Sequence, residues 1–279
     1  MKLTFAAIQR GTLFSPNHIG NDAAIFQVVA DRLLLQGHDV NFYTEEEFLS
    51  RELSERFFFS MIRSKDAVKR QQQYEDAGVI AVNSAYGIEN CTRERMTHLL
   101  LEAGVPHPRS LFLNVGDEVP TDAPMPCWVK RADFHAIHKE DVSYVRHAEE
   151  LKGLLAEYAH RGIARVVVNE HLTGDLIKFY GVHGSDFFYW FYPFEMQHSK
   201  FGLEKINGAP TGISFKEDQL REICCQAAEA LKVDVYGGDA IVAPDGTMRI
   251  IDFNDWPSFA PCREAAADAI SEIILKKVK

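Results

Sequence analysis

The chain has 279 residues, of which 46% are hydrophobic and 25% charged, and its formal net charge is −10. This length and apolar content are sufficient for a large core and correspond to about two domains. The negative charge argues against nucleic acid or an anionic membrane as the main partner.

Targeting signals and disulfide patterns are not apparent. Residues 1–5 run directly into a strand pattern without the apolar stretch of a signal peptide, and no apolar run approaches the ~18 residues of a membrane span. The five cysteines are odd in number and show no CxxC spacing. We therefore expect a cytoplasmic protein with small-molecule partners, and the sequence leaves a homodimer open.

The N-terminal part alternates strands and helices. Strands are expected at 3–8, 40–43, 57–62 and 79–82, and helices at 22–36 and 65–77. This alternation is typical of an open α/β sheet, which binds ligands at the carboxyl ends of its strands. Candidate substrate residues are therefore Arg10, Asn17 and His18 after the first strand, and Arg63 at the end of the third. A plain surface loop is the alternative for residues 9–21.

The remaining chain mixes strands and helices less regularly. A helix is expected over 86–103, and the prolines that follow indicate a domain boundary between residues 84 and 110. Further strands are expected at 128–131, 165–169, 177–182 and 187–192, and helices at 148–159, 219–231 and 263–279.

A hairpin is expected over residues 239–254, because Asp245-Gly246 separates two apolar runs. An even loop centred on these two residues would place Asp239 opposite Asp252, with Asn254 on the same face. Two facing carboxylates repel each other, and a shared cation removes that penalty. Oxygen ligands of this kind suit Mg²⁺.

Two alternatives remain open for this hairpin. Pro244-Asp245-Gly246 can also form a type I turn with a bulged glycine, an odd loop that would move Asp239 off the shared face. Asp252 and Asn254 can also simply end a strand. The metal hypothesis therefore predicts the even register.

The hairpin segment and its flanking residues resemble a known family. The segment GGDAIVAPDGTMRIIDFNDWPSF is similar to the C-terminal signature of ATP-grasp enzymes, in particular the glutathione synthetase and ribosomal-protein glutamate ligase-like branch. In that signature an Asp on one strand and an acid-x-Asn triplet on the next hold magnesium. The resemblance implies that Asp239, Asp252 and Asn254 bind Mg²⁺ (or Mn²⁺), with Asp252 in the place of the usual Glu.

Three further segments match the family in order, over roughly residues 80 to 260. AVNSAYGIENCTRERMTHLLLEAGVPHPRS implies a phosphate-binding role for Arg95, and PCWVKRAD implies the same for Lys130. VVVNEHLTGDLIKFYGV implies that the adenine site lies at Glu170, His171 and Leu172. The same segment implies that Asp175 binds the ribose and that Lys178 lies near the transferred phosphate. The implied catalytic residues are Lys130, Lys178 and Arg95.

The resemblance also implies the fold and the domain order. The expected class is α/β (α+β) with the ATP-grasp fold, in which two subdomains sandwich ATP. We expect an N-terminal α/β domain at 1–88, a central subdomain at 89–168, and a C-terminal subdomain with the metal site at 169–279.

One segment departs from the family pattern. The family has a glycine-rich loop over the phosphates after the strand of Lys130, whereas residues 131–139 contain no glycine. His135 and His138 are candidates to supply phosphate donors instead, with His138 as the cofactor-binding choice. A solvent-exposed polar turn is the alternative.

The reaction follows from the resemblance. Most ATP-grasp enzymes form an acyl phosphate, which an amine or thiol then attacks to give an amide or thioester. We therefore expect a Mg·ATP-dependent carboxylate–amine (or thiol) ligase acting on a small anionic substrate. Lys200 and Ser258 join the substrate candidates, and their chemistry fits a carboxylate or a phosphate. The alternatives are a small-molecule kinase of the polyol or inositol phosphate type and a non-catalytic ATP-binding protein.

Overall fold

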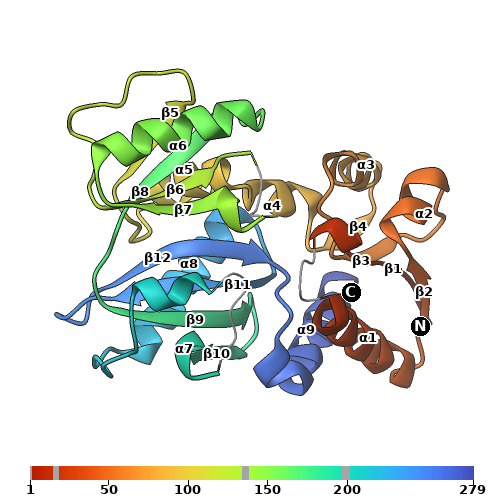
Figure 1. Ribbon diagram of the computed structural model, residues 1–279. Coiled ribbons are helices and arrows are strands. Elements are labelled where there is room, and N and C mark those ends of the chain that lie inside the picture. The colour runs from red at the N-terminus through yellow and green to blue at the C-terminus, as the bar shows by residue number, and fades with distance from the viewer. Residues whose placement is uncertain (1, 15–18, 134–137, 197–201) are drawn as a thin grey trace.

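The computed structural model describes residues 2–14, 19–133, 138–196 and 202–279. The candidate residues Asn17, His18, His135 and Lys200 lie outside these described residues. Three sheets of four strands each make up the framework of the described part. Two of them lie one above the other, and the third lies beside them (Figure 1).

The first sheet is parallel, in the order β2-β1-β3-β4, with strands β1 (Thr4–Ile8), β2 (Asp39–Tyr43), β3 (Phe57–Ser60) and β4 (Ile80–Val82). Its helices are α1 (Ile19–Leu35), α2 (Glu45–Ser50) and α3 (Lys65–Asp76). The predicted strands and both predicted helices are confirmed. The hydrophobic pattern does not predict α2, although Thr44 and Glu47 form the capping box that a T-x-x-E spacing signals. Since β1 and β3 are parallel neighbours, Arg10 and Arg63 lie at the same edge of the sheet.

The second sheet is antiparallel, in the order β5-β8-β6-β7, with strands β5 (Ser110–Asn114), β6 (Cys127–Arg131), β7 (Val142–Val145) and β8 (Arg165–Glu170). Helix α6 (Ala148–His160) packs against it through Leu151, Leu155 and Tyr158. β6, β8 and α6 were expected. β5 and β7 were not, because β5 lies within the proline-rich stretch and β7 has only four residues.

The third sheet is antiparallel, in the order β10-β9-β11-β12, with strands β9 (Asp175–Val182), β10 (Phe188–Phe191), β11 (Val235–Val242) and β12 (Met248–Asp255). Helices α5 (Arg93–Glu102) and α8 (Glu217–Leu231) share a core with this sheet. The expected helix over 86–103 is in fact two helices, α4 (Ala85–Asn90) and α5, because Cys91 ends the first and Thr92 is the N-cap of the second.

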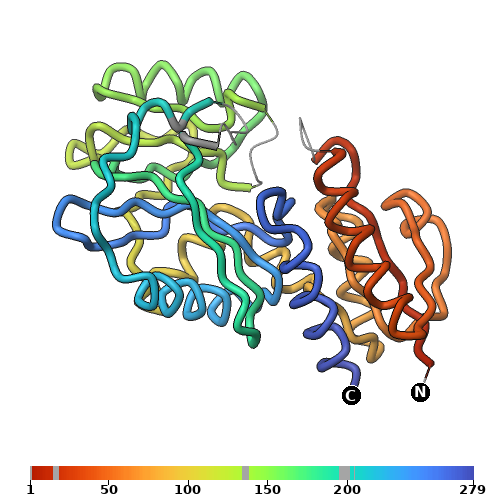
Figure 2. Tube along the Cα trace, turned by 90° about the horizontal axis from the view of Figure 1, so that it is seen from below, coloured from red at the N-terminus to blue at the C-terminus, as the bar shows by residue number. Residues whose placement is uncertain are grey.

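The C-terminal helix α9 (Arg263–Lys277) packs against α1, so the two ends of the chain share one core (Figure 2). This contact joins a helix of the expected domain 169–279 to the expected domain 1–88, and the two domain boundaries stay predictions. Shorter helices are α7 (Pro193–Met196) and the 3₁₀ turns Thr12–Phe14, Lys139–Asp141, Leu203–Ile206 and Ala260–Cys262. None of the described helices has both the length and the apolar composition needed to cross a membrane.

Candidate active site

A cavity of about 230 Å³ lies between the second and third sheets. Trp128 and Lys130 of β6 line it from one side, and Lys178 of β9 and Asp239 of β11 line it from the other. Arg63, in the loop after β3 of the first sheet, also lines the cavity. The cavity therefore gathers side chains from all three sheets.

Asp239 and Asp252 face each other across β11 and β12, as the metal hypothesis requires. The predicted even loop is nevertheless wrong. The pairing of Ala240 with Ile250 shows an odd register at the turn, where Gly246 has φ +82°. A bulge at Ile251 adds one residue to β12 and restores the pairing of the two aspartates.

Close packing between β11 and β12 explains the glycine that precedes Asp239. A Cβ on Gly238 would lie 2.2 Å from the carbonyl oxygen of Asp252. Only a residue without a side chain allows this approach between the strands. Gly238 thus permits the strand geometry that places Asp239 in the cavity.

Lys130 is buried under this bulge. Its Nζ donates a hydrogen bond to the carbonyl oxygen of Ile251 at 2.9 Å. Burial lowers the pKa of Lys130 to about 7, with Arg93 contributing in the same direction, although Asp252 and Asp239 act to raise it. The amine is therefore close to half-protonated at neutral pH, and a negatively charged ligand would favour its charged form.

Each aspartate of the facing pair accepts a hydrogen bond from a cation. Lys178 Nζ lies 2.6 Å from Oδ1 of Asp239, and Arg93 Nη1 lies 3.0 Å from Oδ1 of Asp252. Both carboxylates are 22% exposed and line the cavity, as does Asn254. Two carboxylates and one amide are hard oxygen ligands, and Mg²⁺ combines one or two carboxylates with phosphate and water oxygens. The residues present therefore fit magnesium.

The structure brings Arg93 into the cavity, in place of the predicted Arg95. Arg95 is half-exposed and contacts Glu89 and Asn90 instead. Two residues apart on a helix, the two arginines point in different directions. The signal was present in the sequence, because the buried positions Arg93, Met96, Thr97 and Leu100 follow helical spacing.

Away from Lys130 along the paired strands β6 and β8, the lining of the cavity is less charged. Trp128, Asn169, Glu170 and Leu172 line this part. His171, predicted for the adenine site, is not among the lining residues and accepts a hydrogen bond from Trp128 Nε1 at 3.1 Å. Of the three residues predicted to bind adenine, Glu170 and Leu172 therefore line the cavity, while His171 contacts the lining residue Trp128. Their binding of adenine stays a prediction.

The prediction that Asp175 binds ribose does not agree with its position. Asp175 is buried, is not a lining residue, and accepts hydrogen bonds from the backbone N–H groups of Thr211 and Ile213, each at 2.8 Å. Burial acts to raise the pKa of Asp175, but these hydrogen bonds outweigh it and lower the pKa. Asp175 thus holds the 211–213 segment.

His138 does not reach the cavity either. It is exposed, caps the 3₁₀ turn Lys139–Asp141, and is not among the lining residues. The exposed-turn alternative describes its position.

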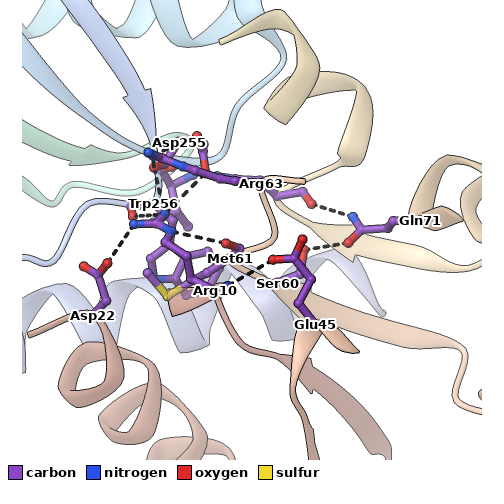
Figure 3. Close-up of polar contacts among 12 residues, drawn as sticks. Arg10, Asp22, Glu45, Ser60, Met61, Arg63, Gln71, Asp255 and Trp256 are labelled. Atoms are coloured by element: carbon purple, nitrogen blue, oxygen red, sulfur yellow. Dashed lines mark hydrogen bonds and ion pairs between the residues drawn. The ribbon is translucent and has the colours of Figure 1, made fainter. Parts of the chain in front are cut away.

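The predicted substrate residues have different surroundings. Arg63 lines the cavity, whereas Arg10 does not and donates to Asp22 and to the backbone oxygen of Trp256 (Figure 3). Ser258 is buried and outside the lining. Of these three residues, Arg63 alone lines the cavity.

The chain shares its fold with known proteins. No protein-family model and no curated protein matches the chain. Among solved structures, the D-alanine–D-alanine ligase from Bacillus anthracis complexed with ATP is 14% identical, with a TM-score of 0.69 and 98% of each chain covered.

Two further ligases are similar over the whole chain. D-alanyl-alanine synthetase A from Vibrio cholerae is 11% identical with a TM-score of 0.70, and the VanG D-Ala:D-Ser ligase from Enterococcus faecalis is 14% identical with a TM-score of 0.67. In both cases 99% of this chain and 98% of the other are covered. The expected fold class is confirmed: the chain has the ATP-grasp fold.

Proposed function

We propose that the chain is a Mg·ATP-dependent ligase that joins the carboxylate of a small anionic substrate to an amine. The proposal rests on one observation: Lys130, Lys178 and Arg93 converge on the facing pair Asp239 and Asp252 in one cavity. Among the described residues, four basic and three acidic side chains line this cavity, whereas the whole chain carries a net charge of −10. The cavity therefore suits a polyanion with a bound cation.

The two ends of the cavity suit the two parts of a nucleotide. Trp128 and Leu172 provide an apolar wall for a base, with the polar Asn169 beside them. Lys130 and Lys178 provide charged donors for phosphate oxygens at the other end. We assign the adenine to the first end and the phosphates to the second.

Asp239, Asp252 and Asn254 would hold Mg²⁺ (or Mn²⁺). When bound, the metal supplies neutralisation of phosphate charge. Lys178 and Arg93 pair with the two carboxylates in this structure and can turn to phosphate oxygens once a metal ion takes their place at the carboxylates. This exchange would bring the side chains of Lys178 and Arg93 to the nucleotide when the metal binds.

The chemistry needs no protein nucleophile. A carboxylate oxygen of the substrate attacks the terminal phosphorus of ATP, and the bond from that phosphorus to the bridging oxygen of ADP breaks. The amine then attacks the acyl carbon, phosphate leaves with the electrons of its C–O bond, and the amine loses a proton to solvent. Lys130, Lys178 and Arg93 bind and orient the phosphates through both steps.

The structural comparison favours a ligase over a kinase, because the solved proteins that share the fold are named as D-Ala–D-Ala and D-Ala:D-Ser ligases. A screen for ADP release against pooled amino acids, small peptides and polyol phosphates tests the proposal. A ligase releases ADP and phosphate only when a carboxylate and an amine are both present. A kinase gives a stable phosphorylated product without free phosphate, and a non-catalytic protein binds ATP without turnover.

Asp252→Asn tests the site itself. The amide keeps the shape but removes the charge that a metal requires, so we expect turnover to fall about 100-fold or more. Asp245→Asn is the matched control, since Asp245 lies in the turn of the same hairpin and bonds to Thr247 away from the cavity. Equal activity of the two variants would contradict the assignment.

A further inference from the structure

Asp255 is a buried carboxylate at the last position of β12, directly after Asn254. Arg63 Nη2 donates to its backbone oxygen and to Oδ1, both at 3.1 Å. Arg10 Nη2 donates to the backbone oxygen of Trp256 at 2.9 Å and lies 3.5 Å from Oδ2 of Asp255. Figure 3 shows both guanidinium groups directed at this strand end. Two loops of the first sheet thus hold the end of the candidate metal-binding strand.

Glu45 joins the two arginine loops to each other. The backbone N–H of Gly11, next to Arg10, donates to Oε2 of Glu45 at 3.0 Å. The backbone N–H of Ser64, next to Arg63, donates to Oε1 at 3.0 Å. A Cβ on Gly11 would lie 2.9 Å from Oε2, so glycine allows this approach. The two arginines are therefore held together at the edge of the first sheet.

Each of the two arginines has a carboxylate partner without a ligand. Arg10 pairs with Asp22 at 3.0 Å, and Arg63 pairs with Asp255. The four side chains are at most 9% exposed. Because two guanidinium groups face two carboxylates out of water, the cluster suits a structural contact better than binding of an anionic substrate.

Successive side chains of a strand point to opposite faces, so Asp255 lies on the face opposite to Asp252 and Asn254. Those two line the cavity, and Asp255 does not. We propose that Asp255 is a positioning residue: held by Arg10 and Arg63, it keeps Asp252 and Asn254 oriented toward the metal. The inference rests on the proposed function, and it gives the first sheet control of metal affinity without supplying a ligand.

Calorimetric binding of ATP, in Mg²⁺ and in EDTA, tests this role on the full chain. Asp255→Asn keeps the shape and removes the charge between the two arginines. Arg10→Lys keeps the charge but loses the multiple donors of the guanidinium, and it serves as the second variant if Asp255→Asn does not fold. In the wild type we expect Mg²⁺ to strengthen ATP binding. In both variants this gain in affinity should be about 10-fold smaller, while the affinity for ATP in EDTA should be nearly unchanged.

Arg32→Ala is the matched control. Arg32 of α1 also links the first sheet to the C-terminal part, through Glu264 and Asp268 of α9, but does not contact β12. We expect Mg²⁺ to strengthen ATP binding by Arg32→Ala as much as it does for the wild type. The positioning role is contradicted if Asp255→Asn and Arg10→Lys keep that effect, or if Arg32→Ala loses it equally. A wild type without Mg²⁺-dependent binding would instead contradict the proposed function, and this inference with it.

Discussion

Asp252 and Asp255 lie three residues apart on β12, and each pairs with an arginine, but their surroundings differ. Asp252 is 22% exposed, lines the cavity and pairs with Arg93, whereas Asp255 is fully buried and pairs with Arg63. A partly exposed pair can exchange partners with a ligand at small cost, while separating a buried pair leaves an uncompensated charge. Burial, more than residue type, thus distinguishes a ligand-binding pair from a structural one.

The largest expected difference between the two aspartates is in stability. We expect Asp255→Ala to lower the free energy of unfolding by about 3–5 kcal/mol, because the buried Arg63 loses its counter-ion and Arg10 loses a second nearby carboxylate. Asp252→Ala should lower it by only about 1 kcal/mol, since Asp252 opens on the cavity, where water can take its place beside Arg93. Urea unfolding measures both, and an unchanged m-value would show that the same surface is exposed. Equal losses would contradict the distinction.

Arg93 and Arg95 give a second comparison, two residues apart on α5. Arg93→Ala should weaken ATP binding by about 10- to 100-fold, because a charged hydrogen bond to phosphate is lost. Arg95→Ala should leave binding nearly unchanged, because Arg95 lies outside the cavity. Calorimetry with Mg·ATP compares them. A larger effect of Arg95→Ala would restore the assignment that the sequence resemblance implied.

The smallest expected effect is a pH dependence that arises from Lys130, whose pKa is about 7. Raising the pH through 7 removes the proton from the amine, so ATP affinity should fall, by at most about 10-fold per pH unit for one proton. Lys130→Arg is the control, because a guanidinium stays protonated over this range. ATP itself titrates near neutrality, and both proteins share that effect. Identical pH profiles would show that Lys130 does not contact phosphate.

The facing of Asp239 and Asp252 could be predicted from the sequence, but the way it arises could not. The Asp245-Gly246 turn and the strand alternation pointed to a shared face for the two carboxylates. The sequence does not indicate the bulge at Ile251, because Ile250 and Ile251 are both apolar and neither marks an extra residue in the strand. Two departures from the expected hairpin, an odd turn and a bulge, compensate each other.

Long-range contacts account for most of what the sequence did not show. The pairing of Arg10 and Arg63 with the end of β12 joins residues more than 190 positions apart. Charge and loop position predicted substrate contact for both arginines, but neither property reveals the buried partners Asp22 and Asp255. Local signals did suffice for the strands of the first sheet, for its helices α1 and α3, and for the strand that carries Lys130.

Metal binding that depends on nucleotide tests the central claim most directly. Free Mn²⁺ can be measured by electron paramagnetic resonance while it is titrated into the protein with and without ATP. We expect the wild type to bind Mn²⁺ more tightly when ATP is present, and the double variant Asp239→Asn, Asp252→Asn to lose this binding. Equal Mn²⁺ binding by the two proteins would contradict the assignment of the facing aspartates as the metal site.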